Sequence, residues 1–475
     1  MPADNKNNNN NNSNIVSGIS VIFIANLISM VLNGLLSFIL PKYLSIESYG
    51  ELKTFQLYLS YAGITGLGFV DGVYLRYGGT KIEHIPKKEL EVYHGSYRVF
   101  NIVLAVITVF VAVLLKNEML LLVGLIFVPF NVSNYYRTFF QAVGEFKRYA
   151  NILAFIPLLT IVLDLIALFV LGFDNPLVYM LILLITNVLA YIYLEAYNTK
   201  IVGSNYYLSF DIRLFYTTAK SGIALLLSNF TSVLLTSMDR LFVKACLSVN
   251  YFSYFSFAVT LENMFNTATA PVTVTLYNYF CSDGNAKDVE AVKTVNKYCS
   301  IASVYLISAA FVCKIIIANF IPKYIEAVPI IFILLGAHVF YFVIKSVYVN
   351  YQKASGEKNI YLKHMVITLL VGTISNYIAT VVKRDMIGFA TSTFISAALW
   401  FVLNIYRYRK SIVSFKAVML QTASILLFFF FATIDSALLG FTGYLATVTI
   451  VVMVLLKKEF LNLINNIYRQ ICKKI

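Results

Sequence analysis

Charged residues are scarce in this sequence. They make up 13% of the 475 residues, whereas 59% are hydrophobic. Soluble domains carry roughly 25% charged and 45–50% apolar residues. A soluble chain of this length has no interior that would hide so much Leu, Ile, Val and Phe, so the composition excludes a soluble globular protein and makes lipid the expected solvent.

Cysteine and the common catalytic motifs are also poorly represented. The five cysteines are scattered without a Cys-x-x-Cys pair, and the four histidines have no metal-ligand spacing, so we expect no disulfide or metal framework. The sequence has no Gly-x-x-x-x-Gly-Lys-Ser/Thr pattern, which excludes ATP hydrolysis by a P-loop. It has no Asp-x-Asp motif, and its predicted outer loops are short. A membrane enzyme such as a polymerase or glycosyltransferase is therefore a weaker alternative than a transporter.

The apolar residues fall into runs that are long enough to cross a bilayer. A hydrocarbon core of about 30 Å needs roughly 20 residues of helix. The sequence predicts fourteen transmembrane helices: 15–40, 52–76, 96–115, 119–142, 151–172, 177–197, 221–245, 251–279, 299–319, 325–351, 360–381, 386–406, 413–434 and 438–457.

The net charge of +14 comes from basic residues in short loops, which is typical of cytoplasmic loops rather than of a nucleic-acid surface. With the N-terminus inside, the inward loops and tails carry about 25 of the basic residues and the outward loops about 7. Both termini are thus predicted to be cytoplasmic. The Asn-rich segment 1–14 reads as a disordered tail and not a signal peptide. Segment 458–475 reads as an amphipathic helix on the inner surface, with a frayed tail as the alternative.

Two short patterns recur in the same order. Gln141 to Glu145 and Gln352 to Glu357 each place a Gly-Glu turn between two predicted spans, and Leu44-Ser45 has a counterpart in Leu247-Ser248. The offset corresponds to six helices. Because six is even, the two halves have the same orientation, as in a parallel repeat. The predicted organisation is a six-helix bundle over 15–200, a second over 201–410, and two additional helices over 411–457.

These patterns carry a family resemblance. The chain resembles the oligosaccharide (O-antigen and related polysaccharide) flippases of the multidrug/oligosaccharidyl-lipid/polysaccharide (MOP) exporter superfamily. The resemblance rests on the motif Pro41-Lys42-Tyr43-Leu44-Ser45 with Tyr49-Gly50, on Gly66-Leu67-Gly68 with Arg76-Tyr77, on Asp239-Arg240, and on the turns at Gly144 and Gly356.

The resemblance implies an all-α polytopic membrane protein with two six-helix bundles around a central, positively charged cavity. It implies that the chain moves an undecaprenyl-diphosphate-linked oligosaccharide across the bacterial inner membrane. The implied partners are this lipid-linked oligosaccharide, membrane lipids and other membrane proteins of polysaccharide assembly. Nucleic acid is not an expected partner, and a monomer is the default state. A lipid II flippase or a multidrug exporter of the same superfamily stays open as an alternative.

Charged residues inside the spans are candidates for function because charge in hydrocarbon is costly. Arginine suits a diphosphate, since its planar fork donates two parallel hydrogen bonds. The alternative is that the side chains snorkel to water or form structural salt bridges, the latter especially for Arg240 beside Asp239. The predicted substrate-binding cations are Arg76, Arg98, Arg137, Arg240 and Lys345.

Acidic residues at membrane depth pair with a base or bind a coupling cation. Asp164 and Glu262 lie near the middle of predicted spans, and Asp71 precedes Arg76 by about one helical turn. We expect no bound cofactor, but coupling to H⁺ or Na⁺ is a hypothesis for these residues. The candidates for ion coupling are Asp71, Asp164, Asp239 and Glu262.

Overall fold

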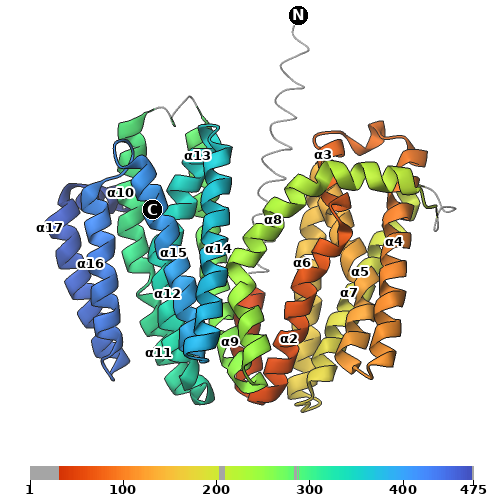
Figure 1. Ribbon diagram of the computed structural model, residues 1–475, viewed down its shortest axis with the longest axis horizontal. Coiled ribbons are helices and arrows are strands. Elements are labelled where there is room, and N and C mark those ends of the chain that lie inside the picture. Colours follow the sequence, from red (N-terminus) through yellow and green to blue (C-terminus); the bar gives the residue numbers. More distant parts are fainter. Residues whose placement is uncertain (1–30, 203–208, 283–285, 287, 473–475) are drawn as a thin grey trace, which may run out of the picture. The chain divides into compact units, whose positions relative to one another are not determined.

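The computed structural model describes residues 31–202, 209–282, 286 and 288–472, and every regular element among them is helical. The chain divides into two compact units, Met1–Ser232 (unit 1) and Val233–Ile475 (unit 2), so the division falls within one long helix, α8. Segment 1–14, the predicted disordered tail, lies outside the described residues. In each unit the long helices run side by side (Figure 1).

The described part of unit 1 opens with a helical segment over 31–43. Its further elements are α2 (Ile46–Ala62), the 3₁₀ helix η1 (Gly63–Gly66), α3 (Phe69–Tyr77), the short η2 (Ile82–His84), α4 (Lys87–Leu114), α5 (Glu118–Ala142), α6 (Phe146–Phe169), α7 (Pro176–Val202) and the first part of α8 (Ile212–Cys246).

Unit 2 contains the remainder of α8 and the helices up to the C-terminal region. These are α9 (Val249–Cys281), α10 (Val289–Leu306), α11 (Ala309–Phe320), η4 (Pro322–Ala327), α12 (Val328–Val343), the π-helical η5 (Ile344–Val349), α13 (Asn350–Ala354), α14 (Lys358–Val382), α15 (Met386–Tyr408), α16 (Phe415–Ala432) and α17 (Ala437–Cys472).

Eleven helices of the described residues are long and apolar enough to cross a membrane. Each of them overlaps one of the fourteen predicted spans. The other three predictions are 15–40, which lies mostly outside the described residues, 52–76, which the structure divides, and 251–279, which falls inside the 33-residue α9. The prediction of an all-α polytopic membrane protein is confirmed: the chain is a multi-pass membrane protein.

Several helices extend beyond the apolar runs that revealed them. The helix α4 starts at Lys87, not at residue 96, and α10 starts at Val289, not at residue 299. Hydropathy detects only the part of a helix that matches the hydrocarbon thickness. The polar turns before it stay helical because their backbone hydrogen bonds are satisfied internally.

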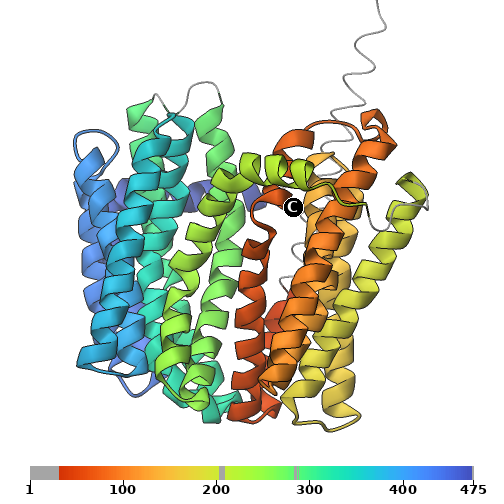
Figure 2. The same ribbon diagram turned by 45° about the vertical axis from the view of Figure 1, so that its right-hand side comes forward.

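The predicted helix 52–76 is interrupted between α2 and α3. Leu67 has φ 50° and Gly68 has φ 88°, a left-handed conformation that no helix continues through. Past the break, α3 lies very close to the start of α8. A Cβ on Gly72 would stand 2.1 Å from the carbonyl oxygen of Thr218, and one on Gly222 would stand 2.0 Å from that of Gly68. Glycines on both helices therefore permit direct backbone contact, as in other membrane helix pairs. Figure 2 shows the first turns of α8 crossing the long helices of unit 1 rather than running along them.

The two Gly-Glu turns have the same backbone structure in the two units. Gly144 and Gly356 have φ values of 77° and 75°. The amide of Glu145 donates to the carbonyl of Phe140 at 2.9 Å, and that of Glu357 donates to Gln352 at 2.8 Å. These six-to-one bonds satisfy carbonyls at the end of one helix and reverse the chain into the next.

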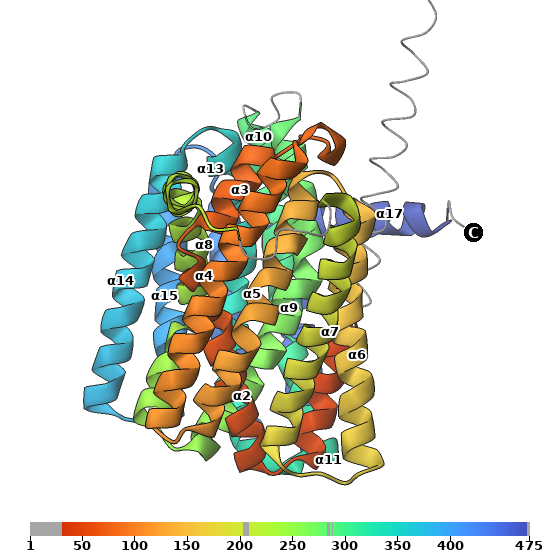
Figure 3. The same cartoon turned by 90° about the vertical axis from the view of Figure 1, so that its right-hand side faces the viewer.

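The C-terminal helix changes direction near its middle. Leu456 has φ −134° and ψ 38°, which breaks the helical backbone of α17 at the end of the predicted span 438–457. Figure 3 shows the turns after this break leaving the direction of the first part of the helix. Glu459 then pairs with Lys297 at 2.7 Å, and Phe460 stacks on Tyr305. The start of the predicted surface helix 458–475 thus packs against α10.

Candidate functional site

A half-open cavity of about 380 Å³ in unit 1 contains one of the predicted cations, Arg137. Four helices supply its wall: α2, α5, α6 and α7. Apolar residues such as Phe130, Ile156 and Leu183 form much of the surface. The polar side chains that line it are Gln56, Ser60, Ser133, Asn134, Arg137 and Asn187. The cavity is thus an apolar chamber with one cation among amides and hydroxyls.

The charge of Arg137 is uncompensated within the described residues. None of their carboxylates lies within ion-pair distance of its guanidinium. Beside it, the hydroxyl of Ser133 is buried without a hydrogen-bond partner. A buried polar group without a partner costs free energy, and a cation without a counter-ion costs more. An anion in this cavity would satisfy both groups.

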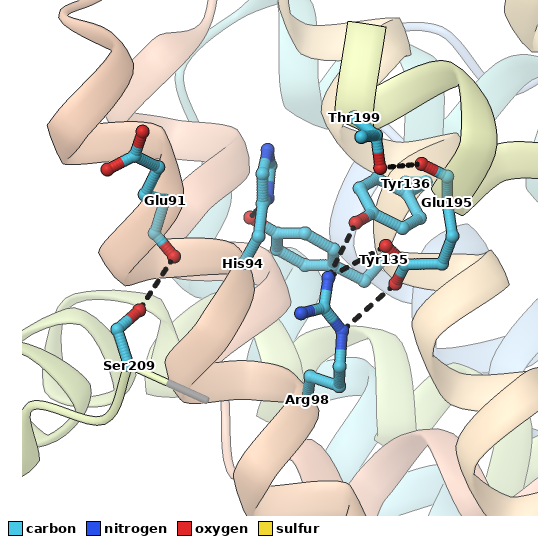
Figure 4. A network of polar contacts seen from close by, with 8 residues as sticks. All are labelled: Glu91, His94, Arg98, Tyr135, Tyr136, Glu195, Thr199 and Ser209. Atoms are coloured by element: carbon cyan, nitrogen blue, oxygen red, sulfur yellow. Dashed lines mark hydrogen bonds and ion pairs between the residues drawn. The ribbon is translucent and has the colours of Figure 1, made fainter. Parts of the chain in front are cut away.

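Arg98 has a different environment, in a polar network buried between α4, α5 and α7 (Figure 4). Its Nε and Nη2 donate to the two carboxylate oxygens of Glu195 at 3.0 and 2.8 Å, and Nη2 also donates to the hydroxyl of Tyr136 at 3.3 Å. Arg98 and Glu195 are only 5% and 6% exposed. This paired geometry neutralises the guanidinium and favours a structural role over contact with substrate.

An aromatic cluster surrounds this network. His94 and the hydroxyl of Tyr135 are in hydrogen-bond contact at 2.6 Å, and Figure 4 shows both side chains next to Arg98 and Tyr136. Tyr135 also stacks on Tyr97, and Tyr97 stacks on Phe69. Tightly packed rings around a satisfied ion pair form a rigid interior. The sequence did not reveal Glu195, because its partner Arg98 is 97 residues away in the chain and no local spacing links the two.

Arg76 and Asp71, both on α3, do not contact each other. Arg76 donates through Nε and Nη2 to one oxygen of Glu89 at 3.1 and 2.8 Å. Its side chain is 55% exposed, so this pair contributes little to stability. Asp71 accepts a hydrogen bond from Asn229 at 3.1 Å. Asp71 and Arg76 are close in the sequence, but each pairs with a different residue.

Asp164 is the most isolated of the predicted acidic residues. It lies on α6, is 4% exposed, and has one carboxylate oxygen, Oδ1, that is buried without a hydrogen-bond partner. No cation of the described residues pairs with it. A buried, unpaired carboxyl group is strongly disfavoured as an anion, so it gains from a bound proton or cation.

In unit 2, Lys345 lies within the π-helical segment η5. Its Nζ donates to Asn266 on α9 at 2.9 Å. One turn later, Asn350 donates to the carbonyl of Thr273 at 2.7 Å, close to Pro271 of the same helix. A π-helix inserts an extra residue into a turn and is frequent at functional sites. Here it brings a cation against the Pro-containing segment of α9.

The remaining predicted residues lie on α8 and α9. Asp239 accepts from the hydroxyl of Thr393 at 3.0 Å and from the backbone amide of Arg240 at 2.7 Å. The suggested salt bridge between the side chains of Asp239 and Arg240 is wrong for the described residues, and the Nε of Arg240 has no partner there. Neighbours in a helix point in different directions, which keeps the charged groups apart. Glu262 pairs with His338 at 3.2 Å.

No protein-family model and no curated protein matches this sequence. Solved structures do. A lipid II flippase, MurJ, in an inward closed conformation is similar over 92% of this chain and 98% of its own, at a TM-score of 0.66 and 14% sequence identity. The chain has the fold of MOP-superfamily transporters. An inward-facing multidrug resistance transporter of the MATE family and the MOP superfamily covers 81% of the chain and 97% of its own length, at a TM-score of 0.50 and 16% identity.

The fold comparison confirms the coarse expectation from the sequence. The resemblance to MOP-superfamily proteins predicted a polytopic helical transporter fold, and both solved structures are transporters of that architecture. Identities this low show the fold alone. The cargo has to be argued from the chemistry of the residues described above.

Proposed function

We propose that this protein moves an undecaprenyl-diphosphate-linked oligosaccharide from the inner to the outer leaflet of a bacterial inner membrane by alternating access. The translocated oligosaccharide would be used in the assembly of a surface polysaccharide such as O-antigen. Transport of this lipid requires a diphosphate and several sugars to cross hydrocarbon, where an isolated ion costs tens of kcal/mol on a Born estimate. The protein has to supply positive charge and hydrogen-bond donors along the way.

The observation that carries the proposal is the setting of Arg137. Its guanidinium lines a cavity of about 380 Å³ and has no acidic partner among the described residues. Asn134, Asn187 and Gln56 line the same cavity. Amides and hydroxyls are suitable partners for sugar hydroxyls, and an unpaired arginine is suited to a phosphate. Of the five predicted cations, Arg137 is therefore the first candidate for binding the diphosphate. Lys345 and Arg240 are the next candidates.

The lipid tail needs a different surface. An apolar groove of about 630 Å³ in unit 2 is lined from α9, α10, α12 and α17 by residues such as Phe265, Val272, Leu306 and Phe342. It has almost no hydrogen-bonding groups apart from Thr269 and two tyrosines. Such a surface accommodates an isoprenoid chain at little cost, because the chain exchanges one apolar contact for another. The apolar groove therefore supports a lipid-linked cargo rather than a small polar one.

Ion coupling is assigned to the buried acidic residues, with Asp164 as the first candidate. Its unpartnered carboxylate would bind a proton or Na⁺ in one state of the cycle. Asp239, Glu262 and Asp71 have partners and are weaker candidates. If Asp164 couples transport to an ion gradient, Asp164→Asn uncouples it. A variant with unchanged dependence on the gradient would remove that role.

Orientation and partners follow from the same proposal. The distribution of Lys and Arg supports a cytoplasmic position for both termini. Other membrane proteins of polysaccharide assembly would receive the translocated lipid. Labelling of single cysteines by a membrane-impermeant reagent, one at Ser355 in the turn at Gly356 and one in the loop before Asp385, tests the orientation. Only the second site should react in intact cells.

Lipid II is the second candidate cargo, because the solved lipid II flippase has the same fold. Lipid II also carries a diphosphate, so the two cargoes share the Arg137 chemistry. A reconstituted assay with the whole protein separates them. We expect transport of a lipid-linked oligosaccharide, with weaker transport of lipid II and no transport of a cationic drug. Preference for the drug would instead favour a multidrug exporter, and turnover of the lipid-linked sugar would favour an enzyme.

A further inference from the structure

A second basic pocket lies in unit 2, between α14 and α15. It has a volume of about 740 Å³. Four cations line it: Lys363 from α14 and Arg407, Arg409 and Lys410 from the end of α15 and the turn that follows. Nothing in the proposed transport route uses these residues. Their concentration in one pocket indicates a ligand that carries negative charge.

Most of this charge is uncompensated. Arg407 pairs with Glu357 at 3.3 Å. Among the described residues, no carboxylate forms an ion pair with Lys363, Arg409 or Lys410, and the guanidinium of Arg409 lies 4.8 Å from the ring centre of Tyr406. Three like charges that share one pocket repel one another. An anion between them would relieve that repulsion.

A buried histidine adds an independent observation. His364 lines the pocket, is only 7% exposed, and has a ring nitrogen, Nδ1, that is buried without a hydrogen-bond partner. Buried polar groups in folded proteins are nearly always hydrogen-bonded. A ligand oxygen that accepts a hydrogen bond from this nitrogen, or a ligand hydroxyl that donates one to it, would satisfy the group.

Apolar residues also line the pocket. Ile360, Ile367 and Leu403 lie among the cations. The spans end close by: α14 contributes Asn359–Val382 and α15 contributes Met386–Tyr408 as membrane-crossing segments. The cations are therefore near the boundary of the hydrocarbon layer, and Leu403 and Ile367 lie deeper within it. Charge at the boundary and apolar surface below it match the two ends of a phospholipid.

We propose that this α14–α15 pocket binds the phosphate headgroup of an anionic membrane phospholipid. The phosphate oxygens accept hydrogen bonds from Lys363, Arg409 and Lys410, and the acyl chains lie along Ile367 and Leu403. Basic pockets between transmembrane helices are suited to anionic headgroups on the cytoplasmic side. The site does not depend on the proposed cargo, so it stands if the transported molecule is another one.

The test uses the full-length protein in detergent, with phosphatidylglycerol as the anionic probe and phosphatidylcholine as the zwitterionic control. Binding is followed by the rise in Tm and by native mass spectrometry. We expect phosphatidylglycerol to raise Tm and phosphatidylcholine to have little effect. Each basic residue near the headgroup accounts for about fivefold in affinity, so the combined variant Lys363→Gln/Arg409→Gln/Lys410→Gln binds about 100-fold more weakly.

A matched variant removes three exposed cations elsewhere. Lys81→Gln/Lys87→Gln/Lys88→Gln loses the same charge from exposed positions of unit 1 and should bind phosphatidylglycerol like the unaltered protein. Both variants keep the normal Tm without lipid, because the side chains removed are exposed. Equal binding by the two variants would overturn the proposal.

Two further arms exclude other sources of phosphate. Inorganic phosphate alone should not raise Tm, because it lacks the chains that occupy the apolar side. An equal rise with inorganic phosphate would overturn a lipid site. Undecaprenyl phosphate should compete with phosphatidylglycerol only weakly. Strong binding of undecaprenyl phosphate without binding of phosphatidylglycerol would overturn the assignment to phospholipid.

Discussion

Units 1 and 2 contain the same chain reversal, but they bury different chemistry beside it. Each has a tyrosine at the same position before the glycine of its Gly-Glu turn, Tyr136 in unit 1 and Tyr348 in unit 2. Tyr136 accepts a hydrogen bond from Arg98, which pairs with Glu195. Tyr348 accepts from a neutral amide, Asn296, at 3.2 Å.

The difference shows how a repeated scaffold specialises. The turn and the tyrosine occur in both units. The charged partner does not, because in unit 2 the tyrosine accepts from an amide that also donates to the carbonyl of Ile412 at 3.0 Å. In unit 1 the buried Arg98 is compensated by Glu195, whereas no carboxylate of the described residues compensates Arg137, which leaves Arg137 available to an anion.

The largest expected effect is the loss of the acidic partner in unit 1. Glu195→Ala leaves Arg98 buried without a counter-ion and should lower the free energy of unfolding by about 3–5 kcal/mol. Replacing both residues, as in Arg98→Met/Glu195→Leu, should restore most of that loss. Unfolding of the detergent-solubilised protein measures both variants. If the double variant is as unstable as the single one, the ion pair is not the cause.

A smaller effect is expected where helices touch through glycine. In Gly222→Ala the new methyl group meets the backbone of Gly68 at 2.0 Å. Overpacking against backbone should cost about 1–3 kcal/mol. The control in unit 2 is Gly372→Ala, where the methyl group meets only the side chains of Ser396 and Met238. Its Tm should change less. The reverse order would contradict the close approach of α3 and α8.

The neutral network of unit 2 should be less sensitive than the charged one. Asn296→Leu leaves the carbonyl of Ile412 and the hydroxyl of Tyr348 without their donor, and should cost about 1–2 kcal/mol. The same unfolding measurement applies. A cost equal to that of Glu195→Ala would erase the contrast between the units.

The smallest effect should be equal in both units. Gly144→Ala and Gly356→Ala place a side chain at positive φ with open space around it. Each should cost about 1 kcal/mol from backbone strain alone. Clearly unequal losses of stability would show that the two turns have different structural roles.

The sequence was sufficient for most membrane-crossing helices, though not for their ends, and for the position of the two Gly-Glu turns, because long apolar runs and a Gly-Glu reversal are local signals. It did not reveal the break at Leu67 and Gly68. That break depends on the approach of α8, whose Gly222 is distant in the chain. The π-helical turn around Lys345 also depends on contacts with α9.

The candidate site could be predicted only as a set of charges. Membrane depth selected Arg98 and Arg137 together, since nothing local distinguishes them. Their surroundings distinguish them. Arg98 pairs with Glu195 from α7, whereas Arg137 lies in a cavity lined by four helices. Pairings between distant helices have no local spacing that sequence reasoning can use.

The most direct test of the central claim is the initial rate of lipid-linked oligosaccharide transport by Arg137→Gln in reconstituted vesicles. We expect the rate to fall at least about tenfold, because the variant loses one charged hydrogen bond to phosphate. Arg137→Lys should retain part of the rate, and Arg98→Met/Glu195→Leu should retain most of it. An unchanged rate in Arg137→Gln would contradict the account.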